Sequence, residues 1–131
     1  MCEYIEKLRT LTPTLPPKPF GDLRKKVGNG MTTYHVKSGV MLSTSLYNEE
    51  ISIAKTFISE NAQLENHFHD GSYEVIIILD GTLEVTTTEG PKRFSKFEKV
   101  DLKKSQPHSA IAITDCWFVA LTVPKDYGFP E

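Results

Sequence analysis

Cysteine is scarce in this 131-residue chain, and the two that occur, Cys2 and Cys116, are too few for a disulfide framework. Because Cys2 lies close to the N-terminus, we expect both thiols to be reduced, as is usual in the cytosol. No apolar run approaches the roughly 20 residues that a membrane helix needs. The charged N-terminus MCEYIEKLRT also lacks the apolar segment of a secretion signal. These absences predict a cytoplasmic protein.

A strong charge of either sign is also missing, since 15 basic and 17 acidic residues leave a formal net charge of −2. This balance gives no general electrostatic case for binding nucleic acid or an anionic membrane. The basic residues between 92 and 104 are interpreted as a solvated strand edge, where lysine blocks edge-to-edge pairing. An anionic ligand at a barrel mouth is the alternative. The length predicts one domain with a real core.

Residues 1–30 are expected to form an N-terminal helix and a proline-rich arm. Apolar residues near one stripe predict a short helix over residues 2–11, which must dock because short helices are unstable alone. Four prolines between residues 13 and 19 forbid a helix and favour an extended arm. That arm would lie along its own barrel or a neighbouring subunit. The basic stretch GDLRKKVGNG, residues 21–30, is expected to be a solvated loop.

Residues 31–125 are rich in β-branched and aromatic residues and predict a single all-β barrel or sandwich, followed by a tail over residues 126–131. No long helix pattern interrupts this region. The predicted strands cover residues 32–47 with a break at Ser38-Gly39, then 51–59, 63–69, 73–80, 82–88, 92–97, 99–104, 109–114 and 116–123.

The stretch HFHDGSYEVIIILDG, residues 67–81, concentrates the chemistry of the chain. Strand side chains repeat every second residue, so His67 and His69 share one face of a strand. The carboxylate of Glu74 follows at the start of an apolar run. Asp80-Gly81 predicts a tight hairpin turn. The pattern therefore brings two imidazoles and a carboxylate close together.

Residues Val75 to Leu79 are apolar on both strand faces, whereas a strand with one wet face alternates. If the Glu74 face lines the interior, the other face must be covered as well. A second sheet layer, the N-terminal arm or a second subunit are the candidates. Together with the arm and the short helix, this feature predicts a homodimer.

A third histidine, His108, begins the apolar stretch HSAIAIT after Pro107. With it, the chain resembles the cupin superfamily, specifically the small single-domain cupins. The first cupin motif runs Gly, five residues, His-x-His, three or four residues, Glu, six residues, Gly. This sequence matches from His67 through Glu74 to Gly81, with Asn61 at the leading glycine position, a residue that also tolerates positive φ.

The second cupin motif matches more poorly. Counting back from His108, the family's Gly, Pro and Gly fall on Phe97, Lys103 and Ser105, and its later Asn falls on Ala112. Those lost residues shape turns rather than bind metal. The resemblance covers roughly residues 50–123 and leaves the N-terminal third outside it.

The resemblance implies a double-stranded β-helix (jelly-roll) barrel in which His67, His69, Glu74 and His108 bind one divalent metal ion. Three imidazoles and a carboxylate suit Fe, Mn, Ni, Cu or Zn better than Ca or Mg. Four protein ligands leave one or two positions on such an ion for water, substrate or dioxygen. The alternative is that each histidine satisfies a core or surface hydrogen bond. His35 matches no motif and is interpreted as structural or exposed.

The expected substrate pocket is small and partly apolar. Alternation from the ligands places five further residues at the site or its rim, and Tyr73 is added as an aromatic candidate for the mouth or core. These pocket residues are Glu65, Tyr73, Ile76, Ile78, Ala110 and Ala112.

Fold and metal together do not choose a reaction. One hypothesis is a metal-dependent, dioxygenase-like enzyme acting on a small organic molecule, with Glu74 as ligand or base; isomerase, lyase and decarboxylase activities are alternatives. The competing hypothesis is a non-catalytic module that binds or senses a small ligand. Neither hypothesis involves nucleic acid or a membrane.

Overall fold

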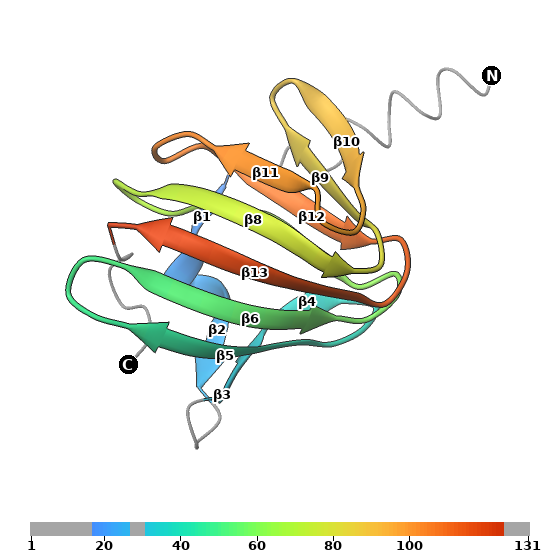
Figure 1. Ribbon diagram of the computed structural model, residues 1–131, viewed down its shortest axis with the longest axis horizontal. Coiled ribbons are helices and arrows are strands. Elements are labelled where there is room, and N and C mark those ends of the chain that lie inside the picture. The colour runs from blue at the N-terminus through green and yellow to red at the C-terminus, as the bar shows by residue number, and fades with distance from the viewer. Residues whose placement is uncertain (1–16, 27–30, 125–131) are drawn as a thin grey trace.

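The computed structural model describes residues 17–26 and 31–124, which form two β-sheets that face each other (Figure 1). The predicted helix over residues 2–11, most of the proline-rich arm and the tail 126–131 lie outside the described residues. No helix among the described residues is long and apolar enough to span a membrane.

One sheet has six strands and carries most of the histidines. Its strands, in spatial order, are β1 (Lys18–Pro19), β7 (Gln63–Phe68), β12 (His108–Ala112), β9 (Leu83–Thr87) and β10 (Gly90–Phe94), while β4 (Val36–Lys37) also pairs with β7. Two short strands, one parallel and one antiparallel, thus share one edge of β7.

The other sheet has seven strands and carries Glu74. Their spatial order is β11 (Lys99–Leu102), β8 (Tyr73–Asp80), β13 (Cys116–Val123), β6 (Ser52–Ile58), β5 (Met41–Tyr47), β3 (Met31–Tyr34) and β2 (Arg24–Lys26). Inward-facing residues alternate along β6 and β13, so the core lies between the two sheets. The all-β jelly-roll prediction is confirmed.

The prediction of a loop over residues 21–30 is wrong for residues 21–26. Phe20–Leu23 forms a 3-10 helix, η1, and Arg24–Lys26 forms β2, which pairs antiparallel with β3. Phe20 and Leu23 are buried, which anchors η1 to the barrel. β2 is the outermost strand on its side of the seven-stranded sheet. The two sheets therefore begin at Lys18 rather than at Met31.

Asp80-Gly81 is not the turn of a hairpin, contrary to the sequence-based expectation. β8 and β9 belong to different sheets and do not pair, so the chain crosses from one sheet to the other here. Only Gly81 has a positive φ, of 82°, whereas a type I′ hairpin turn needs positive φ at both central residues. A Cβ at Gly81 would overlap the carbonyl oxygen of Asp115, so the close packing of this crossing also requires glycine.

The basic strip between residues 92 and 104 lies on strand edges, as predicted. β10 and β11 are the outermost strands of their respective sheets, and the basic side chains there are exposed. Arg93 pairs with Glu84 at 3.2 Å, and Lys99 pairs with Asp101 at 3.4 Å. The strip therefore serves as a charged edge of the barrel.

Candidate metal centre

Three histidine side chains converge on the inner face of the six-stranded sheet. His67 lies near the end of β7, His69 follows directly after it, and His108 begins β12 opposite His67. All three are buried, with 2 to 3% of each residue exposed. Their ligand nitrogens lie within 4.8 Å of one another, which makes them a compact donor cluster.

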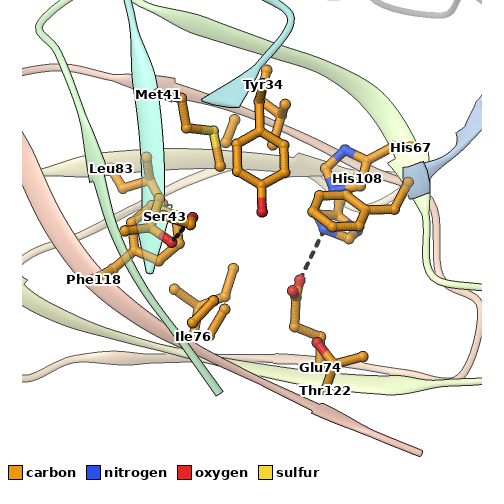
Figure 2. A pocket seen from close by; sticks show the side chains of 16 residues that line it. Tyr34, Met41, Ser43, His67, Glu74, Ile76, Leu83, His108, Phe118 and Thr122 are labelled. Atoms are coloured by element: carbon orange, nitrogen blue, oxygen red, sulfur yellow. Dashed lines mark hydrogen bonds and ion pairs between the residues drawn. The ribbon is translucent and has the colours of Figure 1, made fainter. Parts of the chain in front are cut away.

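Glu74 approaches the cluster from the facing sheet. It lies on β8, is 6% exposed, and points toward the histidines across the interior (Figure 2). Its Oε2 lies 3.1 Å from Nε2 of His69, and its Oε1 lies 3.1 Å from Nε2 of His108. Both sheets therefore contribute to the site, and the carboxylate lies against two imidazoles at once.

Backbone carbonyls fix the tautomers of two of these histidines. Nδ1 of His67 lies 2.8 Å from the carbonyl oxygen of Glu65, and Nδ1 of His108 lies 2.9 Å from that of Gln106. Because a carbonyl oxygen only accepts, each Nδ1 carries the donated hydrogen. In a neutral ring, Nε2 then carries the lone pair that can coordinate a cation, which is the usual arrangement behind metal-binding histidines.

Burial and neighbouring charges shift the pKa values of His67 and Glu74. Burial lowers the pKa of His67 well below its usual range, and the charges of His108 and His69 lower it further. Burial alone would raise the pKa of Glu74. The charge of His69 and hydrogen bonds from His108 and His69 outweigh that effect, so this pKa lies well below its usual range. A neutral imidazole and an ionised carboxylate are the states that bind metal.

The four side chains fit a divalent transition ion. Imidazole nitrogens and carboxylate oxygens are ligands that such ions accept. With metal–nitrogen bonds of about 2.1 Å, two ligand nitrogens stand at most about 4.2 Å apart. The observed spread of up to 4.8 Å requires only a small contraction of the side chains. A bound cation would also compensate the buried charge of Glu74, which is costly in an apolar interior.

A cavity of about 30 Å³ lies beside the cluster, enough room for one or two water molecules. Most of its wall is apolar. Tyr34 points its hydroxyl into this space (Figure 2). The hydroxyls of Ser43 and Thr56, which also line it, bond to each other at 2.5 Å. The residues lining it are Phe20, Tyr34, Met41, Ser43, Ala54, Thr56, Leu64, His67, Glu74, Ile76, Leu83, His108, Ala110, Phe118, Ala120 and Thr122.

The predicted pocket residues divide into three groups. Ile76 and Ala110 line the cavity. Ile78 and Ala112 are fully buried but pack in the core away from it. Glu65 and Tyr73 lie outside the cavity, contrary to expectation: Tyr73 is 55% exposed, and the carboxylate of Glu65 pairs with Lys18 at 3.0 Å near the surface.

A β-bulge explains the position of Glu65. His108 faces His67, but Ala110 faces Leu64, so β7 has one more residue than β12 between these pairs. Leu64 and His67 therefore both point inward although they are three residues apart. Alternation counted back from His67 fails at this point. Tyr73 alternates with Glu74 and faces outward for the ordinary reason.

Several cavity residues were not expected from the sequence. Phe20 and Tyr34 come from the N-terminal part of the chain, outside the motifs, and Thr122 comes from the end of β13. Thr32 and Tyr34 are both buried in β3, so period-two alternation in that strand was the available signal for Tyr34. No sequence signal marked Phe20, because it follows the proline-rich arm.

Three positions that are glycine in the cupin motifs keep a left-handed backbone here without glycine. Asn61, Phe97 and Ser105 have φ angles of 69°, 70° and 57°. These are the three positions that the motif alignment assigned to the family's glycines. The backbone of the turns is thus retained where the residue type is lost, which supports the alignment of the poorly matching second motif.

No family model matches the sequence, and no curated protein matches it significantly. Solved structures do match the fold. An RmlC-like cupin from Shewanella frigidimarina gives a TM-score of 0.66 at 16% identity, covering 82% of this chain and 99% of that chain. The EutQ protein of Clostridium difficile gives 0.61 at 18% identity, covering 88% and 86%. A predicted oxalate decarboxylase from Thermotoga maritima gives 0.61 at 16% identity, covering 77% and 91%.

At identities this low, these likenesses show the fold alone. The chain has the cupin fold, which the spacing of His67, His69, Glu74 and Gly81 predicted. The buried histidine cluster inside that fold is suited to a divalent metal ion.

Proposed function

We propose that this cupin-fold protein binds one divalent transition-metal ion through His67, His69, Glu74 and His108 and acts on a small organic molecule as a dioxygenase-like enzyme. One observation carries the proposal: three buried imidazoles from one sheet meet a carboxylate from the facing sheet, with two nitrogen–oxygen distances of 3.1 Å. The donor set suits Fe, Mn, Ni, Cu or Zn.

When bound, such an ion supplies Lewis acidity and open coordination positions. The protein's own residues orient the ligand atoms, accept a proton and exclude water. His67 and His108 present Nε2 because backbone carbonyls hold their Nδ1 hydrogens. The pKa of Glu74 is lowered, so its ionised carboxylate would serve as a ligand or as the base that takes a proton from the substrate. The apolar wall keeps bulk water from the reacting atoms.

The alternative is a binding or sensing module without catalysis. One observation favours it: Glu65, the second carboxylate expected near the site, lies outside the cavity and pairs with Lys18. Proteins of this fold also carry diverse names, including an ectoine synthase from P. lautus and a sugar phosphate isomerase from Silicibacter pomeroyi. The fold therefore does not choose the reaction.

A homodimer is the proposed assembly. The outer face of the seven-stranded sheet exposes apolar side chains on neighbouring strands, a feature that is uncommon on monomers once it exceeds a few hundred Å². Its most exposed apolar residues on β5, β6, β8 and β13 are Leu46, Ile53, Tyr73, Ile77, Trp117 and Val123. A cytosolic location is also proposed, supported by the buried free thiol of Cys116, whose pKa burial and the charge of Asp80 raise to about 11.

The test has two stages. Metal analysis of protein purified without added metal shows whether an ion is bound and which one. Forms loaded with iron, manganese, nickel, copper or zinc are then assayed for oxygen uptake and product with small acids, thiols and enediols. Turnover with one redox ion supports the enzyme, whereas binding without turnover supports the module. Protein that binds no divalent ion contradicts both the metal site and the enzyme.

A further inference from the structure

Tyr34 brings a phenol hydroxyl to the metal centre from a distant part of the seven-stranded sheet. Its strand, β3, is separated from β8 by three intervening strands, β13, β6 and β5. The curling of the sheet nevertheless places Tyr34 in the wall of the same cavity as Glu74 (Figure 2). Tyr34 is 6% exposed, and its hydroxyl points into the cavity rather than toward solvent.

Phe20 fixes the Tyr34 ring relative to the histidines. The centroid of the Phe20 ring lies 5.2 Å from that of Tyr34 and 4.3 Å from that of His69. The backbone N–H of His35 donates to the carbonyl of Leu23 at 2.8 Å, which ties η1 to β3. The phenol is therefore part of a packed unit that includes a ligand histidine, and its position is set in advance of any ligand.

We propose that the Tyr34 hydroxyl donates a hydrogen bond to a small ligand held on the metal. The acceptor is a ligand atom one or two bonds away from the atom that binds the metal. This inference rests on the proposed metal site. The geometry supports it because Tyr34 and Glu74 line one small cavity next to the histidine cluster. Thr122 also lies in that wall, and the hydroxyls of Ser43 and Thr56 bond to each other, so the Tyr34 assignment rests on the direction of its hydroxyl into the cavity.

The ligand class follows from the space and the chemistry. A cavity of about 30 Å³ with a largely apolar wall accepts only a few atoms unless side chains move. The ligand must offer one donor atom to the metal and a hydrogen-bond acceptor one or two bonds away. Small anions of two or three atoms, and the carboxylate ends of small organic molecules, meet this description.

Azide is a suitable probe, because one terminal nitrogen binds the metal and the other accepts a hydrogen bond. The protein is loaded with Co²⁺, the cobalt content is measured, and azide is titrated while the visible absorption of cobalt is followed. In Tyr34→Phe, which removes only the hydroxyl, we expect unchanged cobalt stoichiometry and azide affinity about three- to tenfold weaker, the usual effect of one neutral hydrogen bond. Tyr47→Phe, at an exposed tyrosine, should match the wild type.

Bromide separates this role from a general disturbance of the site. As a single atom on the metal it has no second acceptor, so Tyr34→Phe should leave its affinity unchanged. If the variant weakens bromide and azide equally, or neither, the Tyr34 proposal is overturned while the metal site stands. Wild-type protein that binds cobalt but no azide also overturns it.

Wild-type protein that binds no cobalt overturns the proposed metal site and the Tyr34 proposal with it. Should Tyr34→Phe fail to fold, a crystal structure of the wild-type cobalt–azide complex decides instead. It should show the distal azide nitrogen about 2.7–3.2 Å from the Tyr34 oxygen. An azide directed elsewhere contradicts the proposal.

Discussion

His67 faces His108 directly across the pairing of β7 with β12, whereas the next facing pair is Leu64 with Ala110. The extra residue in β7 forms a bulge that turns the Glu65 side chain outward. The backbone carbonyl of Glu65 accepts the Nδ1 hydrogen of His67 at 2.8 Å. One local irregularity thus removes a carboxylate from the site and orients the imidazole of His67 within it.

Replacing His67 and His69 together by alanine should abolish stoichiometric metal binding, because only His108 and Glu74 would remain of the four ligands. The double variant and the wild type are compared by metal analysis after dialysis against each ion. His35→Ala is the control, because His35 is an exposed histidine that directly follows β3. This variant should keep full metal occupancy. Full occupancy in the double variant, with its circular dichroism unchanged, would show the assignment to be wrong.

Much of the fold was predictable because its determinants are local. Alternating β-rich segments located the strands, and period-two spacing placed His67 and His69 on one face. The passage of the chain from one sheet to the other at Gly81 was not predictable. An Asp-Gly pair favours a hairpin locally, and only the sheet topology excludes a hairpin here.

The site was predictable only in its ligand-bearing stretch. Glu65 was misplaced because a bulge leaves no mark in residue type, and the counting rule assumes a regular strand. Phe20 and Tyr34 reach the cavity through η1 and the curvature of the sheet, which are consequences of tertiary packing. Residue patterns within one strand carry no information about such distant neighbours.

Phe97→Gly should stabilise the protein. Phe97 has a φ of 70° and is 74% exposed, so its side chain contributes little burial while its Cβ strains the backbone. A left-handed conformation costs an L-residue about 1–2 kcal/mol, and glycine costs about 0.5–1 kcal/mol in lost chain entropy. We expect a net gain of roughly 0.5–1 kcal/mol in the free energy of unfolding, measured by denaturant titration.

Phe97→Ala is the matched control for this gain, because alanine removes the aromatic ring but keeps the Cβ. It should be no more stable than the wild type. A gain in both variants would assign the effect to the ring, which lies near the Lys96 ammonium at 5.2 Å, and not to the backbone.

The metal-free protein should lose stability as the pH falls below about 6.5. Burial keeps the pKa of folded His67 below its usual range, so the unfolded chain binds a proton there at a higher pH than the folded chain does. The contribution of His67 to the free energy of unfolding is therefore complete above about pH 6.5, and it is lost as the pH falls toward the lowered pKa. Glu74 acts in the same direction at lower pH, since its pKa is also lowered.

Denaturant titrations of chelator-treated protein between pH 7.5 and 5 measure this dependence, at most about 1.4 kcal/mol per pH unit for one proton. His67→Asn should flatten the curve below pH 6.5, whereas His35→Asn should leave it unchanged. A wild-type curve that stays level or rises as the pH falls would contradict the neutral state of buried His67.

Ile77→Lys should convert the proposed homodimer into a monomer. Ile77 is 42% exposed on the outer face of β8, next to the edge strand β11, and is paired with Val119 on one side and Lys99 on the other. A lysine there would have to lose its hydration in an apolar interface, which costs far more than the burial of isoleucine gains. Val40→Lys is the matched control, because Val40 is an exposed valine that precedes β5 and is not part of a strand of the sheet. Light scattering at micromolar concentration should give a dimer for the wild type and Val40→Lys and a monomer for Ile77→Lys. A monomeric wild type, or a dimer that tolerates Ile77→Lys, would exclude this face as the subunit interface.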